Sequence, residues 1–195
     1  MCEGIDKAKD KCYNYKGSKN KDGKMNILVL SDSHSRRSMI EEAVARQIKK
    51  PDAIIFLGDG LRDIVSADIG DIPVYSVAGN CDAGSVFFDS NTPTEQNLII
   101  GDKRIFFTHG HKYGVKSTLS PLLCEGVKRG ADIIIFGHTH MPFECELLPD
   151  NAYGIKTDRS VYVMNPGSIG DYPYSFGNIT IDREGRVLLS HGTVK

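Results

Sequence analysis

The chain has 195 residues, of which 40% are hydrophobic and 25% are charged, and it contains no tryptophan. This length is typical of one domain that buries about 70% of its unfolded surface. The net charge of −1 argues against a protein that binds nucleic acid specifically through a basic face. No apolar run approaches the roughly 20 residues needed to span a bilayer, and the first residues are too polar for a signal peptide. We therefore expect a cytoplasmic protein that does not bind membranes, with its five cysteines reduced.

Residues 1–24 differ in composition from everything that follows. They hold seven lysines against four acidic residues, and almost no aliphatic side chains. Such a segment cannot bury enough apolar surface to offset the entropy lost on ordering, so we expect a mobile basic N-terminal extension. Residues 25–195 are expected to form a single domain.

The first half of this domain alternates apolar runs with helical patterns. Continuous apolar runs predict buried strands at residues 25–30, 53–57 and 74–78. The apolar spacing over residues 38–49 predicts an amphipathic helix, and a weaker pattern covers residues 61–67. Each helix would connect two parallel strands in a right-handed βαβ unit.

The second half is richer in strands. Apolar runs predict them at residues 96–100, 104–108, 132–136, 144–148, 161–164, 176–181 and 187–190. The first two are separated by three residues, as in a β-hairpin. A clear helical pattern over residues 115–129 ends at Gly130, which is a common helix-terminating residue. Together these elements predict two strand-rich layers with helices on the outside.

Five of the predicted strands end with the same pattern. In each, a side chain that can bind a metal lies two residues beyond the last apolar residue: Asp32, Asp59, Asn80, His109 and His138. Two turns add a second donor two residues further on, His34 and His140. Ligands of α/β proteins collect outside the carboxyl ends of strands, so these side chains are expected to converge on one rim. A single polar turn would be unremarkable, but five of the six histidines lie in these turns, which favours a metal site.

Seven ligands are too many for one ion that also keeps open positions. A single aspartate bridging two ions would give each ion four protein donors. The mixture of nitrogen and oxygen donors suits Mn²⁺, Fe²⁺, Zn²⁺ or Ni²⁺ rather than Ca²⁺, and there is no thiolate set typical of structural zinc. Two ions about 4 Å apart are a common clamp for in-line displacement at phosphorus.

These turns resemble the calcineurin-like metallophosphoesterases, and in particular the small YfcE-type phosphodiesterases, whose relatives include Vps29. The resemblance covers Met25 to about Lys195 and extends to residues 108–115 and 165–168. It implies an α/β fold, namely a four-layer αββα sandwich in which two mixed β-sheets are flanked by helices. It also implies a phosphoric diester hydrolase that acts on small-molecule phosphate esters with two divalent metal ions, Mn²⁺ first and Ni²⁺, Fe²⁺ or Zn²⁺ as alternatives.

The same resemblance divides the ligands between two metals. One would be held by Asp32, His34 and His140, the other by Asn80, His109 and His138. Asp59 would bridge the two. A metal-bridging hydroxide would attack phosphorus in line, without a covalent enzyme intermediate.

One position departs from the pattern of many family phosphatases. Those phosphatases carry a histidine directly after the asparagine. This histidine is paired with the acidic residue that follows it, and it acts on the leaving group. Here Cys81 stands in that place, followed by Asp82. The residues predicted to take part in catalysis are Asp59, Asn80, Cys81, Asp82 and His111. For His111 the alternatives are contact with the substrate phosphate and orientation of His109.

Two other functions are compatible with these motifs. A phosphomonoesterase or a cyclic-nucleotide phosphodiesterase would use the same site, whereas a Vps29-like scaffold would use the fold to bind proteins. The presence of all seven ligands favours metal chemistry over the scaffold. Because relatives of this kind are often dimers or tetramers, we expect a homodimer or homotetramer.

Overall fold

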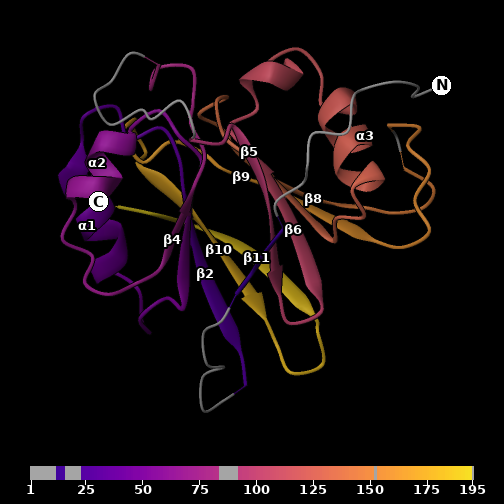
Figure 1. Cartoon of the computed structure of the whole chain (residues 1–195), viewed down its shortest axis with the longest axis horizontal. Coiled ribbons are helices and arrows are strands. Elements are labelled where there is room, and N and C mark those ends of the chain that lie inside the picture. The colour runs from indigo at the N-terminus through magenta and orange to yellow at the C-terminus, as the bar shows by residue number, and fades with distance from the viewer. Residues whose placement is uncertain (1–11, 16–22, 84–91, 152, 195) are drawn as a thin grey trace.

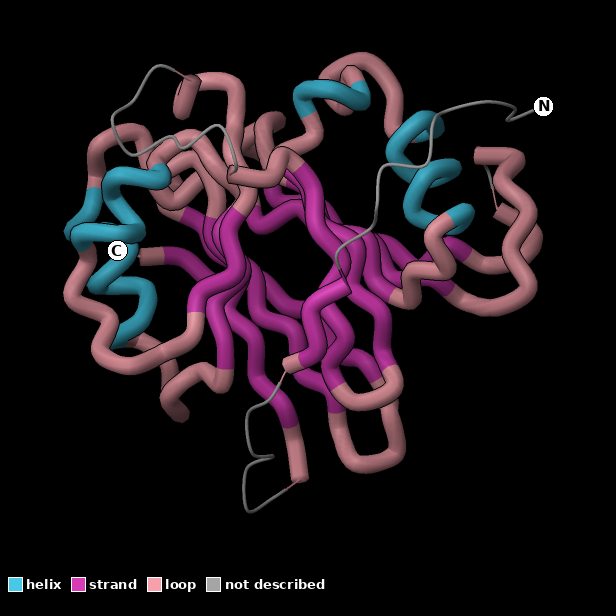
Figure 2. The backbone as a smooth tube through the Cα atoms, viewed as in Figure 1, coloured by secondary structure: helices cyan, strands magenta, loops and turns pink. Residues whose placement is uncertain are grey.

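Two β-sheets face each other at the centre of the molecule, and helices cover their outer faces (Figures 1 and 2). The computed structural model describes residues 12–15, 23–83, 92–151 and 153–194. Helices α1 (Arg37–Ala45) and α2 (Leu61–Ser66) lie on one side, and α3 (Ser120–Lys128) lies on the other. This arrangement confirms the predicted four-layer αββα sandwich. Among the described residues no helix is long and apolar enough to cross a membrane.

The first sheet has five strands in the order β11-β10-β2-β3-β4. Strands β2 (Met25–Leu30), β3 (Ala53–Phe56) and β4 (Val74–Ser76) run parallel, as the predicted βαβ units require. Strands β10 (Ser175–Ile181) and β11 (Val187–Thr193) add an antiparallel hairpin beside β2.

The second sheet has six strands in the order β1-β5-β6-β7-β9-β8. Strands β5 (Glu95–Ile100) and β6 (Lys103–Thr108) form the predicted hairpin. Strands β6, β7 (Ile133–Phe136) and β9 (Val161–Pro166) run parallel, and β8 (Pro142–Leu147) is antiparallel to β9. Strand β1 (Cys12–Asn14) pairs in parallel with β5 at the sheet edge.

The central parallel strands β3 and β7 are buried on both faces, which explains their continuous apolar sequence. Ile55 and Ile135 belong to the cluster between the two sheets, whereas Ile54 packs under α1 and α2 and Ile134 under α3. Full burial of each such side chain contributes about 1.5–3 kcal/mol. The pairing of Leu30 with Phe56, and of Thr108 with Phe136, brings the carboxyl ends of neighbouring strands level.

Two helices are shorter than predicted. Helix α1 ends at Ala45 rather than at residue 49, because the Gln47 side chain donates to the Ala43 carbonyl (2.8 Å), which the next helical N–H would need. Helix α3 begins at Ser120 rather than at residue 115. A 3₁₀ turn (η1, His111–Tyr113) and the left-handed Gly114 (φ 62°) precede it, so the apolar spacing spans two local structures.

Residues 12–15 belong to the segment that we expected to be a mobile extension, and they lie along the edge of the second sheet. Strand β1 uses the open edge of β5, and the Tyr15 N–H donates to the Ile99 carbonyl (3.0 Å). The Tyr15 ring packs against the cluster between the sheets, and its hydroxyl donates to the Asp52 carbonyl (3.1 Å). The Tyr15 side chain thus packs against the core between the sheets, although the composition of residues 1–24 gave no indication of such a contact. Cys2 and most of residues 1–22 lie outside the described residues.

Candidate metal centre

The backbone is strained at the predicted ligand turns. Among the described residues, seven other than glycine have a positive φ, and five of them are predicted ligands: Asp32, His34, Asp59, His138 and His140. The left-handed conformation costs a residue with a side chain about 1–2 kcal/mol. Such strain persists where surrounding contacts enforce it, and it is typical of functional sites. The concentration at these turns therefore marks them as a site.

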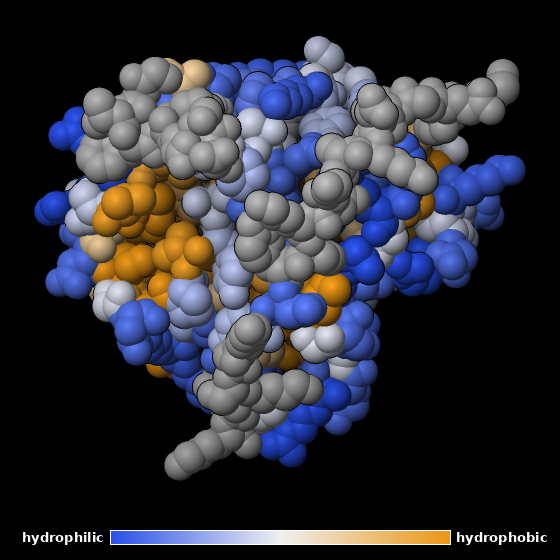
Figure 3. Space-filling model, in the orientation of Figure 1, coloured by the Kyte–Doolittle hydropathy of each residue, from blue (hydrophilic) through white to orange (hydrophobic). Residues whose placement is uncertain are grey.

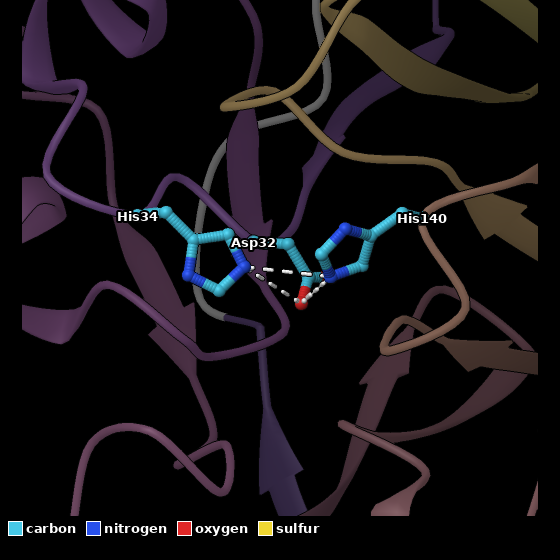
Figure 4. Close-up of side chains that lie close together, drawn as sticks. All are labelled: Asp32, His34 and His140. Atoms are coloured by element: carbon cyan, nitrogen blue, oxygen red, sulfur yellow. Dashed lines mark hydrogen bonds and ion pairs between the residues drawn. The ribbon is translucent and has the colours of Figure 1, made fainter.

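One half of the site consists of Asp32, His34 and His140 (Figure 4). The two rings reach toward Asp32 from opposite sides, and their Nε2 atoms lie 3.4 Å apart. The Oδ1 atom of Asp32 is 3.1 Å from His140 Nε2 and 3.8 Å from His34 Nε2. Asp32 is fully buried, and its Oδ1 makes no properly oriented hydrogen bond within the described structure. Its other oxygen accepts from the Ser31 hydroxyl and the His138 N–H.

The other half brings together Asp59, Asn80, His109 and His138. His109 Nδ1 lies 2.8 Å from the Leu57 carbonyl, which can only accept, so Nδ1 carries a proton. His109 Nε2 lies 3.1 Å from Asn80 Oδ1, 3.1 Å from His138 Nδ1 and 3.4 Å from Asp59 Oδ2. Several lone pairs therefore face one another across this half of the site.

Asp59 lies between the two halves. It forms one close group of possible metal ligands with His109 and His138, and another with His34 and Cys81. His109 Nε2 is also 3.9 Å from Asp32 Oδ1, so the halves adjoin. Converging acceptors of this kind favour binding of a cation, and nitrogen and oxygen donors suit a first-row divalent metal. The residues present thus fit the metals that the motifs imply.

The pKa values reflect the same crowding of charge. Burial opposes ionisation of Asp59, but His109 and the Cys81 N–H hold its pKa well below the usual range. Burial likewise opposes protonation of His109, yet Asp59 and Asp32 raise its pKa. Burial and the neighbouring His109 lower the pKa of His138 to about 4. The two buried carboxylates thus favour the protonated form of His109.

The predicted catalytic residues Cys81 and His111 also lie at the centre. Cys81 is an exposed residue, but partial desolvation of its thiol and the nearby Asp59 carboxylate raise the thiol pKa to about 11, so the thiol is protonated at neutral pH. The His111 ring lies 5.3 Å from that of His109 and 6.2 Å from that of His138. Burial and the charge of His109 lower the pKa of His111, which is therefore a neutral imidazole.

Asp82, which was predicted to take part in catalysis, holds the backbone of the neighbouring loops. Its carboxylate is buried and accepts four backbone N–H groups, from Asp59, Gly60, Leu61 and Gly79, at 2.8–2.9 Å. All its close partners are thus donors in the loops around Asp59. The carboxylate therefore joins these loops, and the catalytic role predicted for Asp82 stays a prediction.

Sequence reasoning missed two polar residues that hold the ligand turns. The Asn165 amide donates to the Gly137 carbonyl and to the Thr139 hydroxyl, both at 2.9 Å, and so fixes the turn that carries His138 and His140. Asp171 Oδ2 lies 2.7 Å from His140 Nδ1. The sequence offered Asn165 only as part of a turn motif, and it offered no signal for Asp171.

Gly137 is needed where the two sheets meet at the site. A Cβ atom at this position would collide with the Ser31 hydroxyl and lie 3.1 Å from Asp32 Oδ2. Only glycine therefore allows the turn after β7 to approach the turn after β2 this closely.

Comparison with known proteins agrees with this geometry. The family model of the calcineurin-like phosphoesterase superfamily domain matches residues 25–184. A probable metallophosphoesterase of Bacillus subtilis, YsnB, is 32% identical over 145 residues, covering 74% of this chain and 75% of that protein. The phosphodiesterase YfcE of Escherichia coli K12 is 28% identical over 117 residues, covering 56% of this chain and 53% of that protein.

Among solved structures, Vacuolar Protein Sorting 29 of Cryptosporidium parvum shares the fold, with a TM-score of 0.63 and 19% identity. The similarity covers 89% of this chain and 100% of that chain. The matched family model spans all seven candidate ligands, and the geometry gathers them at one rim. The chain therefore belongs to the calcineurin-like phosphoesterase superfamily.

Proposed function

We propose that the chain is a dinuclear metal-dependent phosphodiesterase that hydrolyses small-molecule phosphate esters. The observation that carries this proposal is the convergence of lone pairs on one rim. Asp32 Oδ1 is buried without a hydrogen-bond partner among the described residues, and His109 Nε2 lies 3.9 Å from it and 3.1 Å from Asn80 Oδ1. A buried carboxylate oxygen of this kind is costly without a cation.

The seven ligands divide naturally between two ions. Asp32, His34 and His140 would hold one, whereas Asn80, His109 and His138 would hold the other. The Asp59 carboxylate lies 3.4 Å from His109 Nε2 and within 4.8 Å of a ring nitrogen of His34, so it would bridge the two ions. Mn²⁺ is our first choice, with Ni²⁺, Fe²⁺ and Zn²⁺ as alternatives. When bound, two dications activate water and neutralise the charge of a phosphoryl group.

The chain's own residues would support this chemistry without becoming covalently modified. His111, a neutral imidazole beside His109 and His138, can hydrogen-bond to a phosphoryl oxygen. The Cys81 thiol, protonated at neutral pH, is a weak acid beside Asp59. A thiol with so high a pKa protonates a leaving group less readily than an imidazolium would. Esters with poor leaving groups depend most on this protonation. These features favour diesters with acidic leaving groups over sugar phosphates.

A protein-binding scaffold is the candidate from another class. Figure 3 shows apolar surface on the side of the molecule that carries α2 and β4. Val65 in α2 and Val74 in β4 are 70% and 38% exposed. This surface and the fold shared with Vacuolar Protein Sorting 29 support the scaffold, but neither accounts for the strained, converging ligands.

The decisive experiment measures metal content and hydrolysis together. The metal-free protein is reconstituted with Mn²⁺, Ni²⁺, Fe²⁺ or Zn²⁺ and assayed on an aryl phosphodiester, an aryl phosphomonoester and cyclic nucleotides. Two bound ions with diester hydrolysis as the highest activity would support the proposal. Higher monoester or cyclic-nucleotide activity would favour those alternatives, and two ions without hydrolysis would favour the scaffold. Failure to bind two ions would refute a dinuclear centre.

Light scattering tests the proposed homodimer or homotetramer.

A further inference from the structure

The segment between β9 and β10 brings a carboxylate to the metal centre from outside the ligand turns. Asp171 Oδ2 lies 2.7 Å from His140 Nδ1. The opposite nitrogen of the same ring, Nε2, lies 3.1 Å from Asp32 Oδ1. One edge of the His140 ring thus faces the centre, and the other faces Asp171.

We propose that Asp171 is the positioning residue of His140, in a carboxylate–histidine–metal arrangement. An ionised carboxylate only accepts hydrogen bonds, so it keeps the proton on Nδ1 and leaves the Nε2 lone pair for a metal. It also makes the imidazole a more basic ligand. This inference rests on the proposed function, because it assigns Asp171 to one of the two metals in that site.

The backbone around Asp171 is fastened to the loop that carries Asp32. The Asp171 N–H donates to Ser168 Oγ (2.9 Å), and this buried hydroxyl donates to the Asp32 carbonyl (2.9 Å). The N–H groups of Ile169 and Gly170 donate to the carbonyls of Ser31 (2.9 Å) and Asp32 (3.0 Å). These hydrogen bonds fix the backbone of Asp171 relative to that of Asp32. The His140 ring therefore lies between two carboxylates whose backbones are joined.

Gly170 makes this close attachment possible. A Cβ atom there would lie 2.7 Å from the Asp32 carbonyl oxygen, which is backbone and cannot easily move. The close backbone contact between Asp32 and Gly170, which places Asp171 beside the centre, thus depends on a residue without a side chain. A surface loop that made no such contact would not need glycine at this position.

The two halves of the site differ in what supports their histidines. His109 donates from Nδ1 to a neutral backbone carbonyl, that of Leu57. His140 instead faces a charged carboxylate. Loss of the Asp171 charge should therefore weaken the metal at the half with Asp32, His34 and His140, and leave the other metal in place. Removal of such a partner typically lowers metal affinity about 10–100-fold.

A simple surface ion pair is the competing explanation, since the Asp171 side chain is 51% exposed. Such a pair contributes little and would not select one metal. The experiment compares the full chain with Asp171→Asn and with Asp158→Asn, a control whose carboxylate is 87% exposed and pairs with Arg159. Zn²⁺ is titrated calorimetrically into each metal-free protein, and urea unfolding of the metal-free proteins is measured in parallel.

We expect two ions in the wild type and the control, and one site weakened 10–100-fold in Asp171→Asn, with unchanged unfolding. In the Zn²⁺ form, ¹⁵N spectra of His140 should show a protonated Nδ1 and a coordinated Nε2, and the Nδ1–H signal should shift in Asp171→Asn. Equal weakening of both sites, unchanged affinities or an unshifted signal would overturn the role of Asp171 and leave the proposed function intact. A wild type that does not bind two ions would overturn both.

Discussion

The replacement of Asp82 by asparagine tests whether this residue holds the loops or takes part in catalysis. Its Oδ1 accepts from Gly60 and Leu61 and its Oδ2 accepts from Asp59 and Gly79. An asparagine keeps one oxygen but turns an NH₂ group toward the other two donors. Two N–H groups then lose their acceptor, at about 1–3 kcal/mol each. We expect the free energy of unfolding to fall by about 2–6 kcal/mol, a large share of a typical total.

Urea unfolding of the metal-free protein, followed by circular dichroism, measures this change. Asp158→Asn serves as the matched control, because its carboxylate is almost fully exposed, and it should change stability by less than about 0.5 kcal/mol. Hydrolysis by Asp82→Asn should persist, in reduced form, under conditions where the variant is folded. An Asp82→Asn protein as stable as the wild type but devoid of hydrolysis would refute the loop-holding role and restore the catalytic one.

Two further substitutions address the centre itself. Asp59→Asn should abolish hydrolysis and weaken both ions, because Asp59 contacts ligands of both halves; calorimetric loss of only one ion would refute the bridging role. Cys81→His should raise turnover of esters with poor leaving groups, by up to about 10²-fold, because imidazolium is a stronger general acid than the thiol. Steady-state rates on alkyl and aryl esters check this, and unchanged alkyl rates with intact metal content would contradict it.

The strands and the candidate ligands were predictable because both follow from local sequence. A strand buried on both faces requires a continuous apolar run, as in β3 and β7, and the run ends where the chain emerges at the sheet edge. The first polar side chains after each run must then lie on that edge. This is why His109 and His138, from different parts of the chain, were expected together and are found 3.1 Å apart.

The start of α3 was harder to predict, because a helical spacing of apolar residues does not require a helix throughout. Val115 is buried in the same cluster as Leu122 and Leu123, although it precedes α3 by several residues. The chain reaches that cluster through the 3₁₀ turn η1 and Gly114. Packing therefore determined where α3 begins, and the periodicity did not.

The same distinction holds at the metal centre. The candidate ligands could be predicted from the sequence, since turn position and side-chain chemistry are properties of each short segment. The contacts that support them could be seen only in the folded chain: Asp82 joins the loops around Asp59, Asn165 fixes the turn of His138, and Asp171 faces His140. These contacts connect segments that are far apart in the chain, so their geometry depends on how the two sheets pack.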